Sequence, residues 1–332
     1  MARMAINIVT YNSASVIDAC LTSVTAQDYA NFSVTVIDND SRDNTRDVLE
    51  PWRNRGIHVL TNDANLYYSR AHNYGIHETD SEFVLTLNPD VIIRPDFLAR
   101  VVNAFDRHPR IGSINGKLLL LDSTRTDFST LAALPVDTML IDSAGLMMFR
   151  SRRPFLRGNR KPAGSTCMEP AHIFGADGAC AAYRRTMLDD VAVEAEYFDN
   201  DFVIYREDVD LAWRARLYGW DAYYLPEAVG YHVRGFHPGQ SRRSIPNHLK
   251  RQSVKNGWLL VIKNDTPRSV LRDSLYIAPY QLKVLAGLVS IERSSLGAML
   301  DLLKLIPRMR QKRAEIQAKR RRSNDEMQPW FE

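Results

Sequence analysis

The stretch "FVLTLNPDVII", residues 83–93, decides the fold because it shows where a buried strand has to stop. Mostly apolar residues lead into Asn88-Pro89-Asp90, and a second apolar run follows. Pro89 has no backbone N–H to donate to a neighbouring strand, so a central strand ends there. Asn, Pro and Asp are frequent turn residues, and a turn is one explanation of the stop. A metal site is the other, because ligands bind where the strands of an α/β sheet end.

Strand and helix patterns alternate around this stretch through residues 1–110. Short apolar runs predict strands, and apolar residues at helical spacing predict helices. The strand patterns are 5–11, 32–40, 56–63 and 82–90, and the helical patterns are 15–27, 41–52, 68–79 and 94–109. This alternation predicts an α/β fold with a mostly parallel sheet flanked by helices. Polar residues follow each strand at what becomes one shared edge, so we expect a site there.

The pattern loosens beyond residue 110. A basic segment at 150–165 carries the Gly and Pro of a loop, and we place the end of the core fold near residue 245. Residues 246–332 show helical patterns with apolar faces and basic ends, which predicts a helical, basic C-terminal extension.

Positive charge is concentrated in that extension. From Arg308 to Arg322 there are eight basic residues and one acid. They are either a solvated helix end or a contact for anionic lipid headgroups. The apolar faces within 268–322 suit a helix lying on a membrane surface, and they suit packing on the catalytic domain or on a second copy in a homo-oligomer as well.

The bulk composition is that of an ordinary globular protein. The 332 residues are 45% hydrophobic and 25% charged, with a formal net charge of +4. Three cysteines without CxxC spacing fit a reducing, cytoplasmic compartment. The sequence shows neither a signal-peptide pattern nor an uncharged apolar stretch of about 18 residues. No nucleic-acid-reading motif accompanies the positive charge, so we expect no nucleic acid partner.

Two acidic residues at strand ends are candidate ligand contacts. Asp38, in "VIDNDSRDNT", can accept a hydrogen bond from a pyrimidine N3–H or from a sugar hydroxyl. The structural alternative for this stretch is that Asp40 or Ser41 caps the next helix. Asp90 ends the "LNPD" turn, where its carboxylate and the oxygens of a diphosphate would hold Mg²⁺ or Mn²⁺.

The acidic run "EDVD", residues 207–210, begins a predicted helix. The helix dipole favours one or two acids there, but three acids after the apolar "FVIY" favour a functional carboxylate. A general base needs such a carboxylate at the end of a rigid element, facing a cleft. His232, after "AVGY", is either a structural histidine or a ligand for Mn²⁺, and His237 is its rival.

Six motifs, taken in order, resemble those of family 2 glycosyltransferases with the GT-A fold. They are "IVTYNS", "VIDNDSRDNT", "LNPD", "FGADGACAAYRR", "YREDVDLAWRARLYGW" and "LPEAVGYHVRG". The resemblance covers about residues 4–240 and looks like the rhamnosyltransferase-like members that build bacterial cell-surface polysaccharides. It implies a GT-A catalytic domain at 1–245, with 1–110 as the nucleotide-binding half and 111–245 as the acceptor and catalytic half.

The resemblance also implies an activity. The family transfers a sugar, with inversion, from a nucleotide diphosphate sugar donor, assisted by a divalent cation, Mg²⁺ or Mn²⁺. The implied acceptor is a hydroxyl of a growing cell-surface polysaccharide or a lipid-linked glycan, which would place the enzyme in the cytoplasm or peripherally on the inner face of the cell membrane.

Individual roles follow from the motifs. Asp208 matches the catalytic base, and Asp90 and His232 match the metal-associated residues. The implied nucleotide and donor contacts are Thr10, Tyr11, Asn12, Asp38, Arg70, Asn73, Asn88 and Asp90, and the implied acceptor contacts are Asp177 and Glu207. Asn88 replaces the first Asp of the usual DxD motif. Tyr67 and Tyr68 stand where Gly and an aromatic residue are commoner.

Other classes of protein stay open. A nucleotidyltransferase or an NAD(P)-dependent oxidoreductase would use a similar sheet, but the first strand–helix turn, "TYNSAS", lacks the GxGxxG motif. A non-catalytic sugar-binding or scaffolding protein is the other alternative. A processive synthase would carry membrane-spanning helices and a QxxRW-type signature, neither of which this sequence shows, so we expect single sugar addition.

Overall fold

The computed structural model describes residues 2–121, 135–233, 246–290, 292 and 295–332. Its centre is a ten-stranded sheet in the order β10-β12-β6-β11-β4-β1-β2-β3, with β5 beside β12 and β7 beside β6. The strands of this sheet are β1 (Met4–Thr10), β2 (Phe32–Asp38), β3 (His58–Thr61), β4 (Phe83–Leu87), β5 (Val91–Ile93), β6 (Ile111–Leu120), β7 (Ile141–Ser143), β10 (Ala171–Ile173), β11 (Cys180–Arg184) and β12 (Asp221–His232). A separate small sheet pairs β8 (Leu146–Met148) with β9 (Pro154–Leu156).

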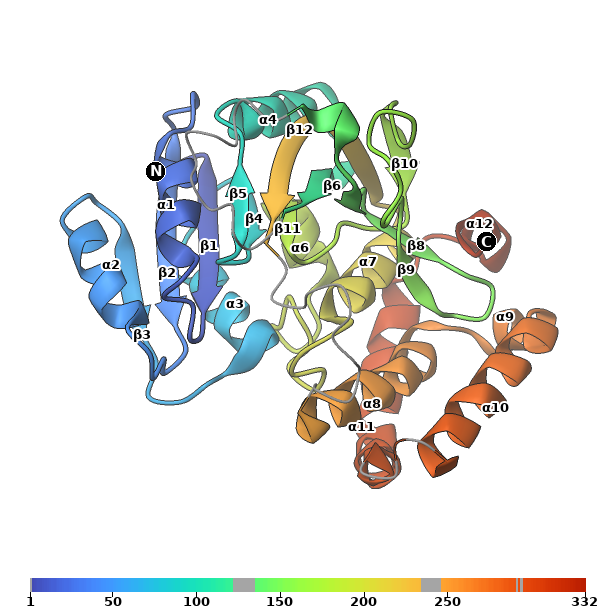
Figure 1. Ribbon diagram of the computed structural model, residues 1–332. Coiled ribbons are helices and arrows are strands. Elements are labelled where there is room, and N and C mark those ends of the chain that lie inside the picture. The colour runs from blue at the N-terminus through green and yellow to red at the C-terminus, as the bar shows by residue number, and fades with distance from the viewer. Residues whose placement is uncertain (1, 122–134, 234–245, 291, 293–294) are drawn as a thin grey trace.

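Helices flank the sheet and gather beside it toward the C-terminal end of the chain (Figure 1). They are α1 (Ile17–Thr25), α2 (Thr45–Arg53), α3 (Tyr67–His77), α4 (Phe97–Arg107), α6 (Arg185–Val191), α7 (Glu207–Leu217), α8 (Asn247–Asn264), α9 (Pro267–Arg272), α10 (Ser274–Ser290), α11 (Gly297–Lys319) and α12 (Asn324–Met327), with short 3-10 turns η1 (Val136–Thr138) and η4 (Gln328–Trp330). The predicted α/β class and the helical C-terminal region are confirmed.

The ends of the N-terminal strands lie in register at one edge of the sheet. β1 runs parallel to β2 and β4, and β2 runs parallel to β3. Thr10 pairs with Asp38, and Asp38 pairs with Thr61. β4 is buried along its whole length, as an apolar central strand should be, and Asn88 follows it at the same edge.

The "NPD" turn carries the chain from one part of the sheet to another. β4 ends before it, and β5 after it pairs with β12, so that Val91 lies opposite His232. The two apolar runs of the opening stretch therefore belong to different places in the sheet. This crossing brings Asp90 next to His232, although 142 positions separate them in the chain.

Strand β11 runs antiparallel to β4 and β6, so its first residues, and not its last, lie at this edge. Cys180 pairs with Leu87, and the N–H of Asn88 donates to the carbonyl of Ala179 at 2.9 Å. The "GADGA" segment before β11 thus meets the turn after β4. The sheet is mostly parallel on its N-terminal side and mixed elsewhere.

The C-terminal helices share a hydrophobic core with the preceding residues. Leu259 of α8, Met309 of α11 and Phe331 near the C-terminus are buried in one cluster with Trp213 of α7. Helices α8 and α11 therefore pack on the catalytic part of the chain, which was one of the expected alternatives. The expected boundary near residue 245 falls within 234–245, outside the described residues.

The basic tract between Arg308 and Arg322 lies against this part of the chain too. Its ion pairs join Arg308 to Glu194 and Asp201, Lys312 to Glu194, Glu196, Asp199 and Asp201, Arg321 to Asp190, and Arg322 to Asp221. The side chains of Lys312 and Arg322 are only 1% and 16% exposed, so these two residues are packed against the catalytic part of the chain and are not simply solvated. Arg308 and Arg321 are paired but remain 45% and 57% exposed, as expected of a solvated helix end, and contact with anionic lipid headgroups stays a prediction. The partners of these four residues come from sequence more than a hundred positions earlier, which no local pattern shows.

Candidate active site

α7 begins after a loop whose backbone is held in the left-handed region. Val203, Tyr205 and Arg206 have φ angles of 65°, 71° and 70°. Non-glycine residues rarely adopt such angles, which cost about 1–3 kcal/mol each unless neighbours enforce them. Asn256 of α8 supplies support, because its side-chain amide donates to three backbone carbonyls within 202–205, at 2.8, 2.9 and 2.7 Å. The C-terminal helix α8 therefore fixes the loop that leads into α7.

Asp208 lies in the first turn of α7, with its carboxylate toward the segment before β11. Its Oδ2 accepts a hydrogen bond from the backbone N–H of Gly178 at 3.0 Å, and its Oδ1 accepts from the N–H of Val209 at 2.7 Å. Burial and the nearby charge of Asp177 raise the pKa of Asp208 to about 6. A carboxyl group with a pKa close to neutrality is well suited to take up a proton during a reaction.

Two further carboxyl groups, those of Glu207 and Asp177, lie near Asp208. Burial and the charge of Asp208 raise the pKa of Glu207 well above its usual value. The backbone N–H of Asp177 donates a hydrogen bond to Oδ1 of Asn115 at 2.7 Å, which fixes the position of Asp177. Negative charges placed close together repel one another. The carboxyl groups of Asp177, Glu207 and Asp208 therefore hold a proton near neutral pH more readily than isolated carboxylates do.

A cavity of about 500 Å³ opens in front of these groups. It brings together the predicted site residues Asn88, Asp177, Glu207, Asp208 and His232. The other walls are Tyr68, Leu146, Pro154, Phe155, Leu156, Asn159, Gly178, Ala179, Ile204, Tyr205, Arg206 and Val209. The volume and the mixture of apolar walls with a few polar groups are typical of small-molecule sites.

His232 is held between two carboxylates at the end of β12. Its Nε2 lies 3.3 Å from Oδ1 of Asp90, and its Nδ1 lies 2.7 Å from Oδ2 of the buried Asp142 on β7. Burial disfavours the charged ring, but both carboxylates favour it, and together they raise the pKa of His232 to about 10. A nitrogen that binds a metal carries no proton, so the ligand role proposed for Nε2 requires its proton to leave when a cation binds, while Nδ1 keeps its contact with Asp142.

Asp90 and His232 fit a divalent cation as part of a ligand set. Within the described ranges no group of three or more His, Cys, Asp or Glu side chains could hold a metal by itself. A carboxylate and an imidazole suit Mn²⁺, and substrate phosphates commonly complete such sites. The contact from Asp142 to the far ring nitrogen is the usual outer support of a metal-binding histidine. The rival His237 lies outside the described residues.

Comparison with known proteins adds the family. Residues 5–192, more than half of the chain, match the family model described as glycosyl transferase family 2. The chain belongs to glycosyl transferase family 2. It is 23% identical over 220 residues to the poly-beta-1,6-N-acetyl-D-glucosamine synthase of Staphylococcus epidermidis, a match covering 66% of this chain and 47% of the synthase. The chain thus spans about half the length of that relative.

A second relative matches over most of its own length. It is the N-acetylglucosaminyl-diphospho-decaprenol L-rhamnosyltransferase of Mycobacterium tuberculosis strain H37Rv. The two are 26% identical over 269 residues, which is 75% of this chain and 84% of the relative.

Solved structures confirm the GT-A fold of this family member. TarS 1–349 of S. aureus, in complex with UDP-GlcNAc, has a TM-score of 0.56 at 16% identity and covers 98% of this chain and 89% of its own. The mannosyltransferase PcManGT of Pyrobaculum calidifontis, in complex with GDP-Man and Mn²⁺, has a TM-score of 0.52 at 16% identity, covering 96% and 85%. A divalent cation therefore accompanies the nucleotide sugar in at least one structure of this fold.

Asp38 forms a second polar centre, at the other end of the strand edge. Its carboxylate is fully buried and accepts from the Thr10 hydroxyl at 3.2 Å, the Ser41 N–H at 3.3 Å and Arg46 Nε at 2.8 Å. The expectation that Asp40 or Ser41 caps the next helix is wrong. α2 starts at Thr45, and its first N–H donates to Asp43 at 3.0 Å.

The remaining predicted donor contacts have different surroundings. Tyr11 is exposed, and the Asn12 side chain accepts the N–H of Arg42 at 2.8 Å, so both lie beside the Asp38 centre. Arg70 is exposed on α3. Asn73 is buried and exchanges hydrogen bonds with the backbone of Phe198 at 2.7 and 2.9 Å. Its amide is committed to the fold, so the structure does not bring it to the cavity.

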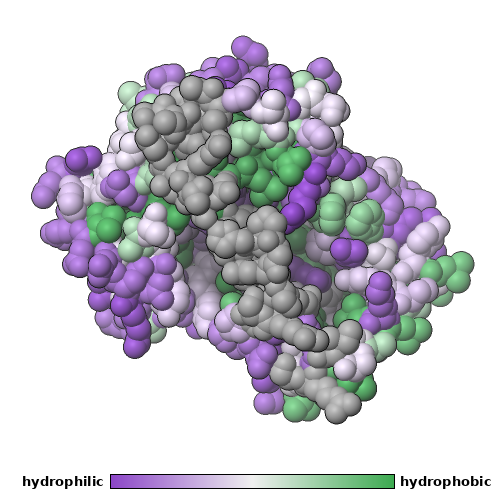
Figure 2. All heavy atoms as spheres, in the orientation of Figure 1, coloured by the Kyte–Doolittle hydropathy of each residue, from purple (hydrophilic) through white to green (hydrophobic). Residues whose placement is uncertain are grey.

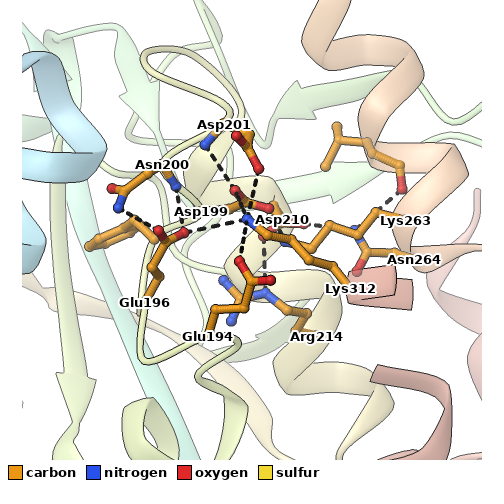
Figure 3. Close-up of polar contacts among 12 residues, drawn as sticks. Glu194, Glu196, Asp199, Asn200, Asp201, Asp210, Arg214, Lys263, Asn264 and Lys312 are labelled. Carbon is orange, nitrogen blue, oxygen red and sulfur yellow. Dashed lines mark hydrogen bonds and ion pairs between the residues drawn. The ribbon is translucent and has the colours of Figure 1, made fainter. Parts of the chain in front are cut away.

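A buried cluster of opposite charges anchors the far side of α7 (Figure 3). Lys263 of α8 lies 2.6 Å from Asp199 and 2.8 Å from Asp210, the last acid of the "EDVD" run. Lys312 of α11 lies 2.7 Å from Asp199 and 2.8 Å from Asp201. Although burial opposes ionisation, the two lysines hold the pKa of Asp199 below its usual value. Asp210 therefore anchors the helix, while Asp208 on the same run faces the cavity.

Sequence reasoning missed the supporting residues. Asp142, Asn256, Lys263 and Lys312 stand in no motif, and each acts on a segment at least 50 residues away. For Asp142, the signal that could have found it is a buried acid in a short apolar strand pattern, since such an acid requires a partner.

Proposed function

We propose that this family member is an inverting glycosyltransferase that moves a sugar from a nucleotide diphosphate donor to a hydroxyl of a cell-surface glycan. The observation that carries the proposal is the position of Asp208. It is a carboxyl group with a raised pKa, on the wall of a sugar-sized cavity, with Asn88 and His232 among the other walls. That arrangement supports an acceptor hydroxyl on one side and a donor diphosphate on the other.

In the proposed reaction, Asp208 takes the proton of the acceptor hydroxyl while the oxygen attacks the anomeric carbon. The bond from that carbon to the diphosphate breaks on the opposite face, so the configuration inverts. Glu207 and Asp177 line the acceptor side, and burial together with the charge of Asp177 keeps the proton affinity of Asp208 high. The backbone N–H groups of Gly178 and Val209 fix the orientation of the carboxylate.

We propose that Asp90 and His232 hold Mg²⁺ or Mn²⁺ on the donor side. When bound, such a cation offsets the charge that develops on the leaving diphosphate. Asp142 keeps the His232 ring oriented with Nε2 toward Asp90. Asn88, beside Asp90, is an uncharged donor and acceptor for the sugar or the ribose.

For the base of the donor we propose a pyrimidine, read by Asp38. Uracil and thymine both offer an N3–H to its carboxylate. Because that carboxylate is fully buried and held by Thr10, Ser41 and Arg46, the base contact requires the exposed Arg46 side chain to release it. Tyr11 and Asn12 lie next to this carboxylate and are proposed to contact the nucleoside.

We propose rhamnose as the sugar and a lipid-diphosphate-linked glycan as the acceptor. The mycobacterial relative, named as an L-rhamnosyltransferase of N-acetylglucosaminyl-diphospho-decaprenol, supports both, because the match covers 84% of its length. Such an acceptor would bring the enzyme to the inner face of the cell membrane.

The test is a transfer assay with the purified chain. It combines Mn²⁺, an N-acetylglucosaminyl-diphospho-polyprenol and, separately, dTDP-rhamnose, UDP-GlcNAc and GDP-mannose. We expect glycosylated lipid and free dTDP only with the rhamnose donor. Transfer from GDP-mannose alone would contradict the pyrimidine proposal, and lack of transfer with every donor and added acceptor would favour the non-catalytic alternative.

A further inference from the structure

α10 presents an apolar face to solvent. Leu275 is 84% exposed and Leu282 is 65% exposed, which is unusual for leucine in a well-packed helix. These residues are seven positions apart and so lie on one side of the helix. Ala278, Pro279 and Ala286 are exposed between and beyond them, and Leu271 of α9 is 77% exposed just before them. We call Leu271, Leu275, Ala278, Pro279, Leu282 and Ala286 the α10 face.

The opposite side of α10 attaches it to the molecule. Ile277 is buried on that side, and Leu288 packs in a small cluster with Val254 of α8 and Ala298 of α11. Figure 2 shows hydrophobic residues gathered at the edge of the molecule where Figure 1 places α9 and α10. A second set of exposed leucines, Leu296, Leu300 and Leu303, lies at helical spacing at the beginning of α11.

The charge exposed on α10 is positive, and the acid within the start of α11, Asp301, is paired with Arg251. The sequence of α10 contains no Asp or Glu, and Lys283 is exposed beside the α10 face. Lys304 is exposed next to Leu303 on α11. The acid that precedes α10, Asp273, is buried and held by Arg150 at 2.7 Å and Arg152 at 2.9 Å. No negative side chain of α10 therefore opposes approach to an anionic surface.

These features select one kind of partner. A second copy of the chain would bring another α10 that carries no acid, so Lys283 would meet no opposite charge on that helix and the two α10 faces would not complement each other in charge. An apolar stripe flanked by lysines does complement the headgroup region of a bilayer containing anionic lipid. In the part of the chain that the structure describes, no helix is long and apolar enough to cross a membrane.

We propose that the α10 face, together with the exposed leucines at the start of α11, docks the protein on the surface of an anionic bilayer. Leucine side chains enter the boundary between headgroups and acyl chains, and the lysines contact the phosphates. This surface differs from the basic tract at 308–322, whose Arg308, Lys312, Arg321 and Arg322 pair with acids of the same chain. The inference stands apart from the proposed sugar transfer, since it needs neither donor nor acceptor.

The test is sedimentation of the purified full chain with phosphatidylcholine vesicles, with and without phosphatidylglycerol. We expect binding to the phosphatidylglycerol vesicles, and we expect the double variant Leu275→Glu/Leu282→Glu to weaken it about tenfold or more. The matched control is Leu140→Glu/Met168→Glu, which adds the same charge at two other exposed apolar positions, 42% and 47% exposed. It should bind like the original chain.

Three outcomes of this experiment would overturn the proposal. One is an original chain that does not sediment with phosphatidylglycerol vesicles. Another is equal weakening in both double variants, which would reduce the effect to net charge. The last is a stable dimer that only Leu275→Glu/Leu282→Glu dissociates, without vesicle binding by the original chain, which would make this face a subunit interface. Thermal unfolding of each variant confirms that it is folded.

Discussion

The Nδ1 atom of His232 lies 2.7 Å from the Oδ2 atom of Asp142, and both residues are buried. This pair connects β12 to β7 and leaves the Nε2 atom of the ring directed at Asp90, 3.3 Å away. The contact explains how a single histidine can serve the fold and the proposed metal site together. It also shows that the proposed donor side of the cavity depends on a residue outside every recognised motif.

Replacing Asp142 tests this support. We expect Asp142→Ala to weaken Mn²⁺ binding about 10–100-fold, because the His232 ring loses the acceptor that orients it. Asp142→Asn keeps an acceptor oxygen and should lose less. Mn²⁺ affinity in the presence of UDP or dTDP, followed by electron paramagnetic resonance, measures the effect without turnover. Asp137→Asn, at an exposed acid before the same strand, is the control. Equal affinity in Asp142→Ala and the original chain would show that the contact is not needed for the metal.

The loop before α7 provides a second prediction. Asn256→Ala leaves three buried carbonyls without their donor, and we expect the free energy of unfolding to fall by about 1–3 kcal/mol. Because the loop sets the position of Asp208, kcat should fall as well, with little change in the KM for the donor. Urea unfolding and steady-state kinetics measure the two effects. Ser253→Ala, one turn earlier on α8, is the control. A stable Asn256→Ala enzyme with unchanged kcat would refute the positioning role.

The buried cluster predicts a further loss of stability. In Lys312→Met the carboxylates of Asp199 and Asp201 lose one charged partner within 2.8 Å but keep Lys263 and Arg308, so we expect the free energy of unfolding to fall by about 1–3 kcal/mol. Lys304→Met removes an exposed lysine from the same helix and should change stability by less than about 0.5 kcal/mol. Denaturant unfolding measures the free energy of unfolding of both variants. Similar values for the two would mean that the cluster contributes little.

The pH dependence of transfer follows from the pKa of Asp208. A base has to be deprotonated to act, and its pKa is raised to about 6, so kcat/KM should fall as the pH drops below about 6. The charge of Asp177 is one cause of the raised value. Asp177→Asn should therefore move this acidic limb to lower pH, whatever it does to the maximum rate. A limb that stays in place would assign the titration to another group.

Much of the architecture could be predicted because its signals are local. Apolar runs ending in polar residues mark β1, β2, β3 and β4, and parallel pairing brings their ends to one edge. Asp38, Asn88 and Asp90 could be selected for this reason, and Asp208 from an unusual acidic helix start. The beginning of β11 could not be assigned to that edge from sequence, because its antiparallel direction depends on pairing rather than on composition.

The rest depends on contacts between distant segments. Arg308 and Lys312 look like solvated charges in the sequence, yet their partners lie at Glu194 to Asp201, over a hundred positions earlier. Asp142 and Asn256 act through single hydrogen-bonded contacts that leave no periodic pattern. Asn73 resembles a donor contact by motif, but packing of α3 turns its amide to Phe198.

The most direct test of the central claim is the rate of sugar transfer by Asp208→Asn. The substitution keeps the shape of the side chain and removes its ability to take a proton. We predict a fall in kcat of about 100-fold or more, with donor binding retained, as judged by thermal stabilisation with the nucleotide sugar and Mn²⁺. Asp325→Asn, at an exposed acid, should transfer sugar like the original chain. Transfer by Asp208→Asn at a rate near that of the original chain would contradict the assignment of Asp208 as the base.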